Sequence, residues 1–217
     1  MASQQAHQLL AQTPQRVYVS FFGMPEDTVA ERVTAAGRAL AIQVGTVADG
    51  VHAAALGAVV IAQGVEAGGH LLGHSGRDEL VAHPADLAAA GPDVATARDV
   101  LGCGGRRQIE RPGQRRAPVQ QQGAIVLLAG IEPHAADVAA IDAIGRADGL
   151  IAVAAGAGGH AGGLSPFALI QEIRSFFDGP LLLSGAIATG RAILVARAAG
   201  ADLAYIGSPF IATVEAD

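Results

Sequence analysis

Residues 149–207 read "GLIAVAAGAGGHAGGLSPFALIQEIRSFFDGPLLLSGAIATGRAILVARAAGADLAYIG", and this stretch shows the repeating unit of the chain. Three apolar runs, at 150–155, 180–185 and 203–207, alternate with helical periodicity at 166–177 and 191–200. Apolar runs without polar alternation are typical of strands buried on both faces of a parallel sheet. The stretch therefore predicts an α/β fold with helices packed on parallel strands.

The same alternation of strand and helix occurs earlier in the chain. Further strands are predicted at 17–22, 40–46, 58–64 and 124–130, and further helices at 26–37, 48–57 and 133–147. A β/α barrel and an open doubly wound sheet both fit this order, and both place functional residues at the carboxyl ends of the strands. The residues alone leave both arrangements open, and with seven predicted strands instead of eight a TIM-type barrel would be incomplete or irregular.

Residues 1–217 are expected to form one domain, since half of the residues are hydrophobic and the length suits a single core. Residues 92–123 interrupt the pattern with arginine, proline and glutamine. We interpret them as an irregular insertion or linker. Two other interpretations stay open: an arginine patch that binds an anion or a partner, and a junction foreign to the fold.

The composition excludes several classes of function. All 14 basic residues are arginine, so a Walker phosphate loop and lysine Schiff-base chemistry are excluded. The single cysteine, Cys103, excludes an internal disulfide and a cysteine-rich metal site. A net charge of −6 gives no attraction to nucleic acid, and no apolar run is long enough to span a membrane. With no signal-peptide pattern at the N-terminus, we expect a cytoplasmic protein, and leave a homo-oligomer open.

Two loops combine glycines with a histidine at the end of a predicted strand. "AVVIAQGVEAGGH" (58–70) leads to His70, and "LIAVAAGAGGH" (150–160) leads to His160. Glycine lets backbone amides approach a ligand closely, and histidine can accept a proton near neutral pH. These loops suit an anionic cofactor beside a base, although a structural histidine in an ordinary turn is the alternative.

Two later strand ends also carry small residues. Ser184 and Gly185 follow one strand, and Gly207 and Ser208 follow the last strand before a possible helix start. Small residues that precede helix starts at successive strand ends are typical of a phosphate site in the last loops of a barrel. Tight packing of ordinary turns is the alternative explanation.

A metal site is a weaker hypothesis. His70 and His74 in "HLLGH" have the i, i+4 spacing of helical zinc ligands. Leu71 occupies the position of the glutamate of a metalloprotease pair, and the nearby glycines disfavour a helix. We therefore predict loop histidines and no metal.

Residues 149–213 closely resemble the C-terminal part of nitronate monooxygenases, formerly 2-nitropropane dioxygenases, and residues 17–70 resemble their middle part. The resemblance rests on the AGGH-type loops followed by "SGAIATG" and "YIGSP". It implies an FMN-dependent β/α barrel that oxidises alkyl nitronates with dioxygen. A wider substrate class would include nitroalkanes. The motif occurs twice, 90 residues apart, and the strands that open the family's barrel have no counterpart before residue 17, so a truncated or recombined member is expected.

The resemblance also implies roles for individual residues. His160, or alternatively His70, would be the catalytic base or substrate-orienting group. The implied cofactor-binding residues are Gln63, Gly68, Gly158, Gly185, Ala186, Tyr205, Ile206, Gly207 and Ser208. Two positions depart from the family pattern: Ala186 replaces the more usual second glycine of the phosphate pair, and Val153 occupies the glutamine position of the second loop.

Two alternatives to a nitronate monooxygenase follow from the same residues. The absence of the first strands and the break at 92–123 are also what a non-catalytic, degenerate barrel fragment would show. An FMN-dependent NAD(P)H:quinone reductase on the same scaffold is the second alternative, and no dinucleotide fingerprint supports it. The presence or absence of bound flavin separates enzyme from fragment.

Overall fold

The structure of the chain is a computed structural model that describes residues 18–63, 72–73, 126–131, 147–158 and 161–214. Within these ranges seven strands form one sheet, all neighbours are parallel, and the spatial order follows the chain order. The strands are β1 (Tyr18–Phe22), β2 (Ala39–Val44), β3 (Val59–Ala62), β4 (Val126–Ile131), β5 (Gly149–Val153), β6 (Leu181–Ser184) and β7 (Leu203–Ala204). The predicted α/β class with parallel strands is confirmed.

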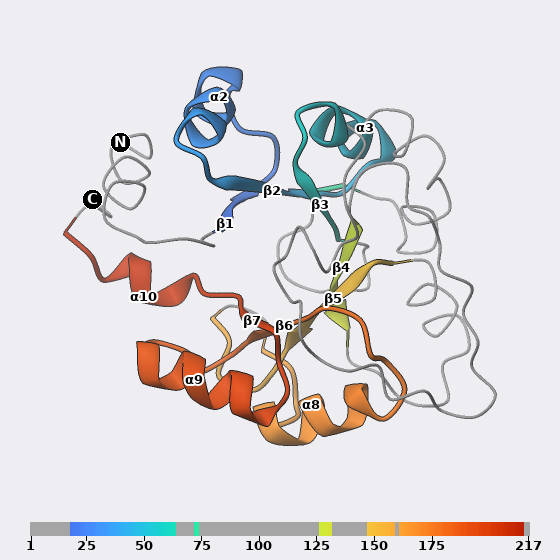
Figure 1. The fold of residues 1–217 in the computed structure, drawn as a ribbon, viewed down its shortest axis with the longest axis vertical. Coiled ribbons are helices and arrows are strands. Elements are labelled where there is room, and N and C mark those ends of the chain that lie inside the picture. Colours follow the sequence, from blue (N-terminus) through green and yellow to red (C-terminus); the bar gives the residue numbers. More distant parts are fainter. Residues whose placement is uncertain (1–17, 64–71, 74–125, 132–146, 159–160, 215–217) are drawn as a thin grey trace.

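Five helices connect the described strands or follow them. They are α2 (Asp27–Ala35), α3 (Val47–Ala55), α8 (Pro166–Arg174), α9 (Gly190–Ala199) and the single turn α10 (Ser208–Ile211). Hydroxyl side chains at Thr46, Ser165 and Thr189 each accept a hydrogen bond from a backbone amide of the first turn, which fixes where α3, α8 and α9 begin. Figure 1 shows α2 and α3 outside β1–β3, and α8 and α9 outside β5–β7.

The predicted segments agree with the observed elements to within a few residues at each end. The largest differences are at the ends of α8 and β7, which stop at Arg174 and Ala204, each three residues before the predicted end. The helix predicted at 133–147 and the irregular segment at 92–123 lie outside the described residues, so the single-domain organisation stays a prediction. No helix among the residues the structure covers has the length and apolarity to cross a membrane.

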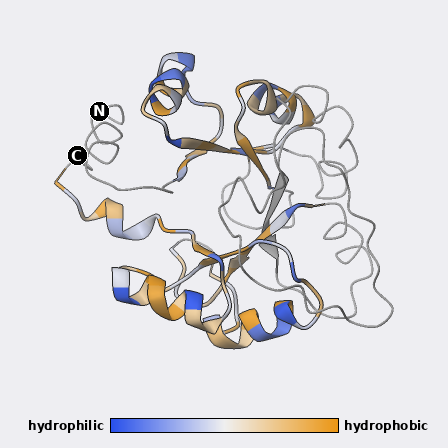
Figure 2. Ribbon diagram, in the orientation of Figure 1, coloured by the Kyte–Doolittle hydropathy of each residue, from blue (hydrophilic) through white to orange (hydrophobic). Residues whose placement is uncertain are grey.

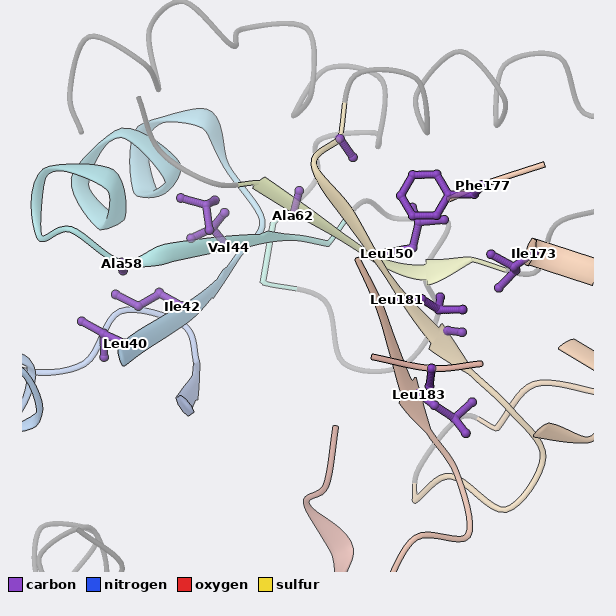
Figure 3. Close-up of a cluster of buried hydrophobic side chains, with 14 of the residues drawn as sticks. Leu40, Ile42, Val44, Ala58, Ala62, Leu150, Ile173, Phe177, Leu181 and Leu183 are labelled. Carbon is purple, nitrogen blue, oxygen red and sulfur yellow. The ribbon is translucent and has the colours of Figure 1, made fainter. Parts of the chain in front are cut away.

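The outer face of the sheet packs against the helices. Alternate strand residues, among them Ile42, Val60, Leu150 and Leu181, are almost fully buried there. Figure 3 shows such side chains in two groups, one along β2 and β3 and the other where Ile173 and the residues around it meet β5 and β6. Figure 2 shows β2 and β3 as mainly hydrophobic, whereas the helices alternate between hydrophilic and hydrophobic residues. Outer-face packing therefore sets how each helix lies on the sheet.

The inner face of the sheet forms a second cluster that joins its two edge strands. Its buried members are Ala41, Val59, Ile61, Ile151 and Leu182, and the partly buried residues packed against them are Tyr18, Leu203 and Tyr205. Residues of the first strand and of the last strand segment thus share one core, so the sheet is strongly rolled. The Ser20 hydroxyl also lies 3.0 Å from the Tyr205 hydroxyl, across the gap.

The rolled sheet is nevertheless open. Strand pairing joins β1 only to β2 and β7 only to β6, so the described strands do not close into a barrel. Figure 1 shows the gap on the side where β1 and β7 face each other. The barrel part of the fold expectation therefore stays a prediction, and across the gap the described contacts are between side chains.

The amino ends of β6 and β7 are held by one charged group. Arg174, the last residue of α8, donates to the carbonyls of Gly200 (3.0 Å), Phe177 (3.2 Å) and Gly179 (2.7 Å). Its Nη2 lies 2.7 Å from Asp202 Oδ2, and the side chains are only 16% and 9% exposed. Asp202 Oδ2 also accepts from the Leu181 amide. The guanidinium therefore ties the end of α8 to the starts of two strands.

We predict that Arg174→Ala destabilises the protein strongly. Removing one partner of a buried ion pair costs about 3 kcal/mol or more, since three carbonyls lose their donor and Asp202 loses its counter-charge. The free energy of unfolding, measured by urea denaturation, checks this. Arg197→Ala, at an exposed position on α9, is the control and should change stability by less than about 0.5 kcal/mol.

We predict that the Ser20–Tyr205 contact couples the two edges of the sheet. In a double-mutant cycle of Ser20→Ala and Tyr205→Phe, the coupling energy should be about 0.5–1.5 kcal/mol in favour of the pair. Unfolding of the four proteins in urea gives this quantity. A coupling energy indistinguishable from zero would show that the hydroxyl contact does not hold the edges together.

Candidate functional site

The loops that leave β5, β6 and β7 meet at the carboxyl end of the sheet. A Cβ atom on Gly156 would lie 3.0 Å from the Cβ of Ala186, and one on Gly158 would strike the Ser208 hydroxyl. The loop after β5 therefore contacts the loops after β6 and β7. The contacts are this close because Gly156 and Gly158 have no side chains. The structure brings together Gly158, Ala186 and Ser208, three of the predicted site residues.

The turn after β6 has an unusual backbone. Gly185 has φ +127° and Ala186 has φ +54°, and Ala186 is the only non-glycine residue with positive φ in the described part of the chain. The Ala186 amide donates to the Gly156 carbonyl at 2.9 Å, and a Cβ on Gly185 would lie 2.9 Å from the Ala154 carbonyl oxygen. The left-handed turn is thus held in place by the loop after β5.

The turn after β7 combines a fixed start with an open end. The Tyr205 amide donates to the Leu183 carbonyl at 2.8 Å, and Ile206 is partly buried against the outer core. At Gly207, in contrast, no described atom lies within 4 Å of where a Cβ would be. An open space next to a backbone amide is the local condition that a bound phosphate requires.

Gln63 is the first residue after β3, at the carboxyl end of the sheet. It is 8% exposed and is the single buried polar residue among those described. Its backbone amide donates to the Val44 carbonyl at 3.0 Å. Strand alternation places it on the inner face, two residues beyond the inner-core residue Ile61. Val153 lies at the equivalent inner position, two residues beyond Ile151 on β5. Gln63 and Val153, which match the family's glutamine in the two copies of the motif, therefore both lie on the inner face of the sheet.

The segment that follows the first histidine loop returns to the ends of β1 and β2. Gly73 lies so close to Gly45 that a Cβ on either residue would strike the other's backbone, and a Cβ on Gly23 would lie 3.4 Å from Leu72 Cδ2. Sequence analysis did not single out this contact, although a glycine directly after each strand was visible in the sequence. The segment of Leu72 and Gly73 thus lies against the turns that follow β1 and β2, and its closest contact is with the backbone of Gly45.

Three predicted site residues, His160, His70 and Gly68, lie outside the described residues, as does the alternative zinc pair formed by His70 and His74. The roles assigned to them stay predictions. Gly158 and Ala161, which flank the loop of His160, are described, and Gly158 lies at the contact with Ser208. No group of three or more potential metal ligands occurs in the part of the chain that the structure describes.

Comparisons with known proteins give remote likenesses only. No family model and no curated protein matches the chain. Among solved structures it is similar to the FabK (M276A) mutant from Thermotoga maritima, with 19% identity over 89% of this chain and 53% of that chain and a TM-score of 0.49. Nitroalkane oxidase from Streptomyces ansochromogenes has 23% identity over 97% and 38%, with a TM-score of 0.29.

A third similar structure, the BexX/CysO complex from Amycolatopsis orientalis, has 14% identity over 90% of this chain and 72% of that chain, with a TM-score of 0.44. The chain spans about half the length of the FabK structure that it matches. Because likenesses this remote do not transfer a site, the function must be argued from the chain's own residues.

We predict that Ala186→Gly stabilises the protein. A left-handed conformation costs an alanine about 1 kcal/mol or more, and glycine adopts it freely. The control is Ala188→Gly, two residues on, where φ is not positive and the added chain flexibility should cost about 0.5–1 kcal/mol. Thermal unfolding of both variants and the parent measures the two effects, and a loss of stability in Ala186→Gly would contradict the prediction.

Proposed function

We propose that this chain is an FMN-dependent oxidoreductase of the nitronate monooxygenase type, which oxidises alkyl nitronates with dioxygen. The wider substrate class would include nitroalkanes. The observation that carries the proposal is the meeting of three loops at one edge of the sheet, through Gly156 against Ala186 and Gly158 against Ser208. These loops contain the motif residues on which the family resemblance rests.

The backbone after β6 and β7 fits the phosphate of FMN. In the proposal, the amides of Gly185, Gly207 and Ser208 hold the phosphate oxygens, while the Ala186 amide donates to the Gly156 carbonyl and keeps the turn in place. The exposure of Gly207 and the open space where its Cβ would lie support this, because a ligand can approach the backbone closely there. Thr189, which begins the ten-residue helix α9, follows the first of these turns, so the positive end of that helix dipole lies on the same loop.

The proposal assigns the remaining motif residues to the flavin ring and the substrate. Gln63, Gly68 and Gly158 would contact the ring, with Gln63 already buried on the inner face. FMN, when bound, supplies the redox chemistry, and the protein supplies binding, orientation and charge. Tyr205 and Ile206 would fix the position of the last phosphate loop, through the inner and the outer core respectively.

His160 is the proposed base that takes a proton from a nitroalkane or orients the nitronate. Its loop is the one whose glycine contacts Ser208, and that contact favours it over His70. An imidazole side chain is suited to proton transfer near neutral pH. His70 stays the alternative, because the segment after it also returns to the carboxyl edge of the sheet through Leu72 and Gly73.

The open sheet supports a second candidate function, that of a non-catalytic barrel fragment. Between β1 and β7 the described strands leave unpaired edges where the proposed TIM-type barrel would continue. Such a fragment would keep the fold of each half and lack a competent flavin site. Flavin binding distinguishes the two candidates.

We predict that the purified chain binds one FMN, seen as a flavin absorbance band that remains after desalting, and that it consumes dioxygen with alkyl nitronate. His160→Ala should keep the flavin and lose about 10²–10⁴-fold in nitroalkane turnover, because only proton transfer is removed. The measurements are a flavin titration and steady-state oxygen consumption.

The matched control is His52→Ala, which changes an exposed histidine on α3 and should leave both flavin and turnover unchanged. Unchanged turnover in His160→Ala together with loss in His70→Ala would transfer the role to His70. A parent protein that cannot bind added FMN would overturn the flavin proposal and favour the non-catalytic fragment.

A further inference from the structure

Phe22 is the last residue of β1, and its ring lies on the inner face of the rolled sheet. Along β1, Val19 and Phe21 pack against the outer core, whereas Tyr18 packs against the inner cluster and Ser20 contacts the inner residue Tyr205. Successive side chains of a strand point to opposite faces. Phe22 therefore belongs to the inner set, at the carboxyl end where the candidate site lies.

Its exposure sets Phe22 apart from the other large apolar side chains of the inner face. The ring is 56% exposed, although inner residues deeper in the sheet, such as Ile61, are almost fully buried. Its pairing partner on β2 is the polar Gln43, and the next residue is Gly23, whose φ of +85° turns the chain away from the strand. More than half of this large apolar residue is thus open to solvent, at the carboxyl end of the inner face.

We propose that Phe22 is a specificity-determining residue that contacts the alkyl chain of the substrate. This inference rests on the proposed function and goes beyond it, because it names which part of the chain recognises the apolar part of an alkyl nitronate. Contact with an alkyl group would remove the exposed ring surface and the methylene groups from water together, which is the favourable term in such recognition. Longer unbranched nitronates should therefore be preferred to short ones.

The first experiment compares ethyl and butyl nitronate with the parent protein, Phe22→Leu and Phe22→Ala, each loaded with FMN. In the parent, kcat/KM should rise about fourfold for each added methylene, the equivalent of about 0.8 kcal/mol. Phe22→Leu should keep most of this preference and Phe22→Ala should lose it, with the FMN dissociation constant unchanged in both. A preference unchanged in Phe22→Ala, or a loss of FMN affinity instead, would overturn the inference.

A second experiment does not depend on turnover. The chain contains no tryptophan, so Phe22→Trp introduces a single reporter. Titration with 1-nitrobutane should change its fluorescence with saturation. Leu194→Trp is the control, at a 65% exposed position on the outer helix α9, and should show only a linear, collisional decrease.

The two experiments separate failure of the inference from failure of the proposed function. If the parent binds no FMN and the Phe22→Trp signal saturates, the flavin proposal fails and Phe22 still contacts an apolar ligand. If the parent is an active flavoprotein and the Phe22→Trp signal is linear like that of Leu194→Trp, the flavin proposal stands and the inference about Phe22 is overturned. A linear signal in a protein without flavin overturns both.

Discussion

The structure depends on the packing of one small apolar cluster inside the rolled sheet. Tyr18 from the first strand, and Leu203 and Tyr205 from the last, bury part of their surface against the same residues of β2, β3, β5 and β6. Burial of this shared surface stabilises curvature that strand pairing alone does not require, because a parallel sheet can also lie open and twisted. Without the cluster, no shared buried apolar surface would hold β1 and β7 near each other.

The curvature explains why small residues gather at the carboxyl edge. When neighbouring strands tilt and roll, the loops that leave them converge, and the backbone of one loop meets the backbone or a small side chain of another at distances that a side chain on the glycine would prevent. The Gly45–Gly73 and Gly158–Ser208 contacts show this on the two halves of the sheet. The same absence of side chains leaves amides accessible, so the packing requirement and the proposed binding of a phosphate favour the same residues.

The ion pair that stabilises the fold and the residues of the candidate site lie at opposite ends of the strands. The network of Arg174 and Asp202 lies at the amino ends of β6 and β7, and it ties α8 to both strands with charged hydrogen bonds. The strained turn at Ala186 lies at the opposite end of β6. Parallel β/α proteins often divide their residues in this way, since loops at one end can vary while the other end fixes the strands.

The sequence by itself determined the order and type of the elements. Apolar runs such as that of β6 and the glycines that follow α2, α3 and α9 are local signals, and they can be detected without knowledge of the fold. It also placed Gly158, Ala186 and Ser208 in one candidate site through the family resemblance. Only the tertiary structure decided that Ala186 is left-handed, that Ser20 faces Tyr205, and that Phe22 is exposed on the inner face. These features depend on how far the sheet rolls, and that is set by packing between strands distant in the sequence.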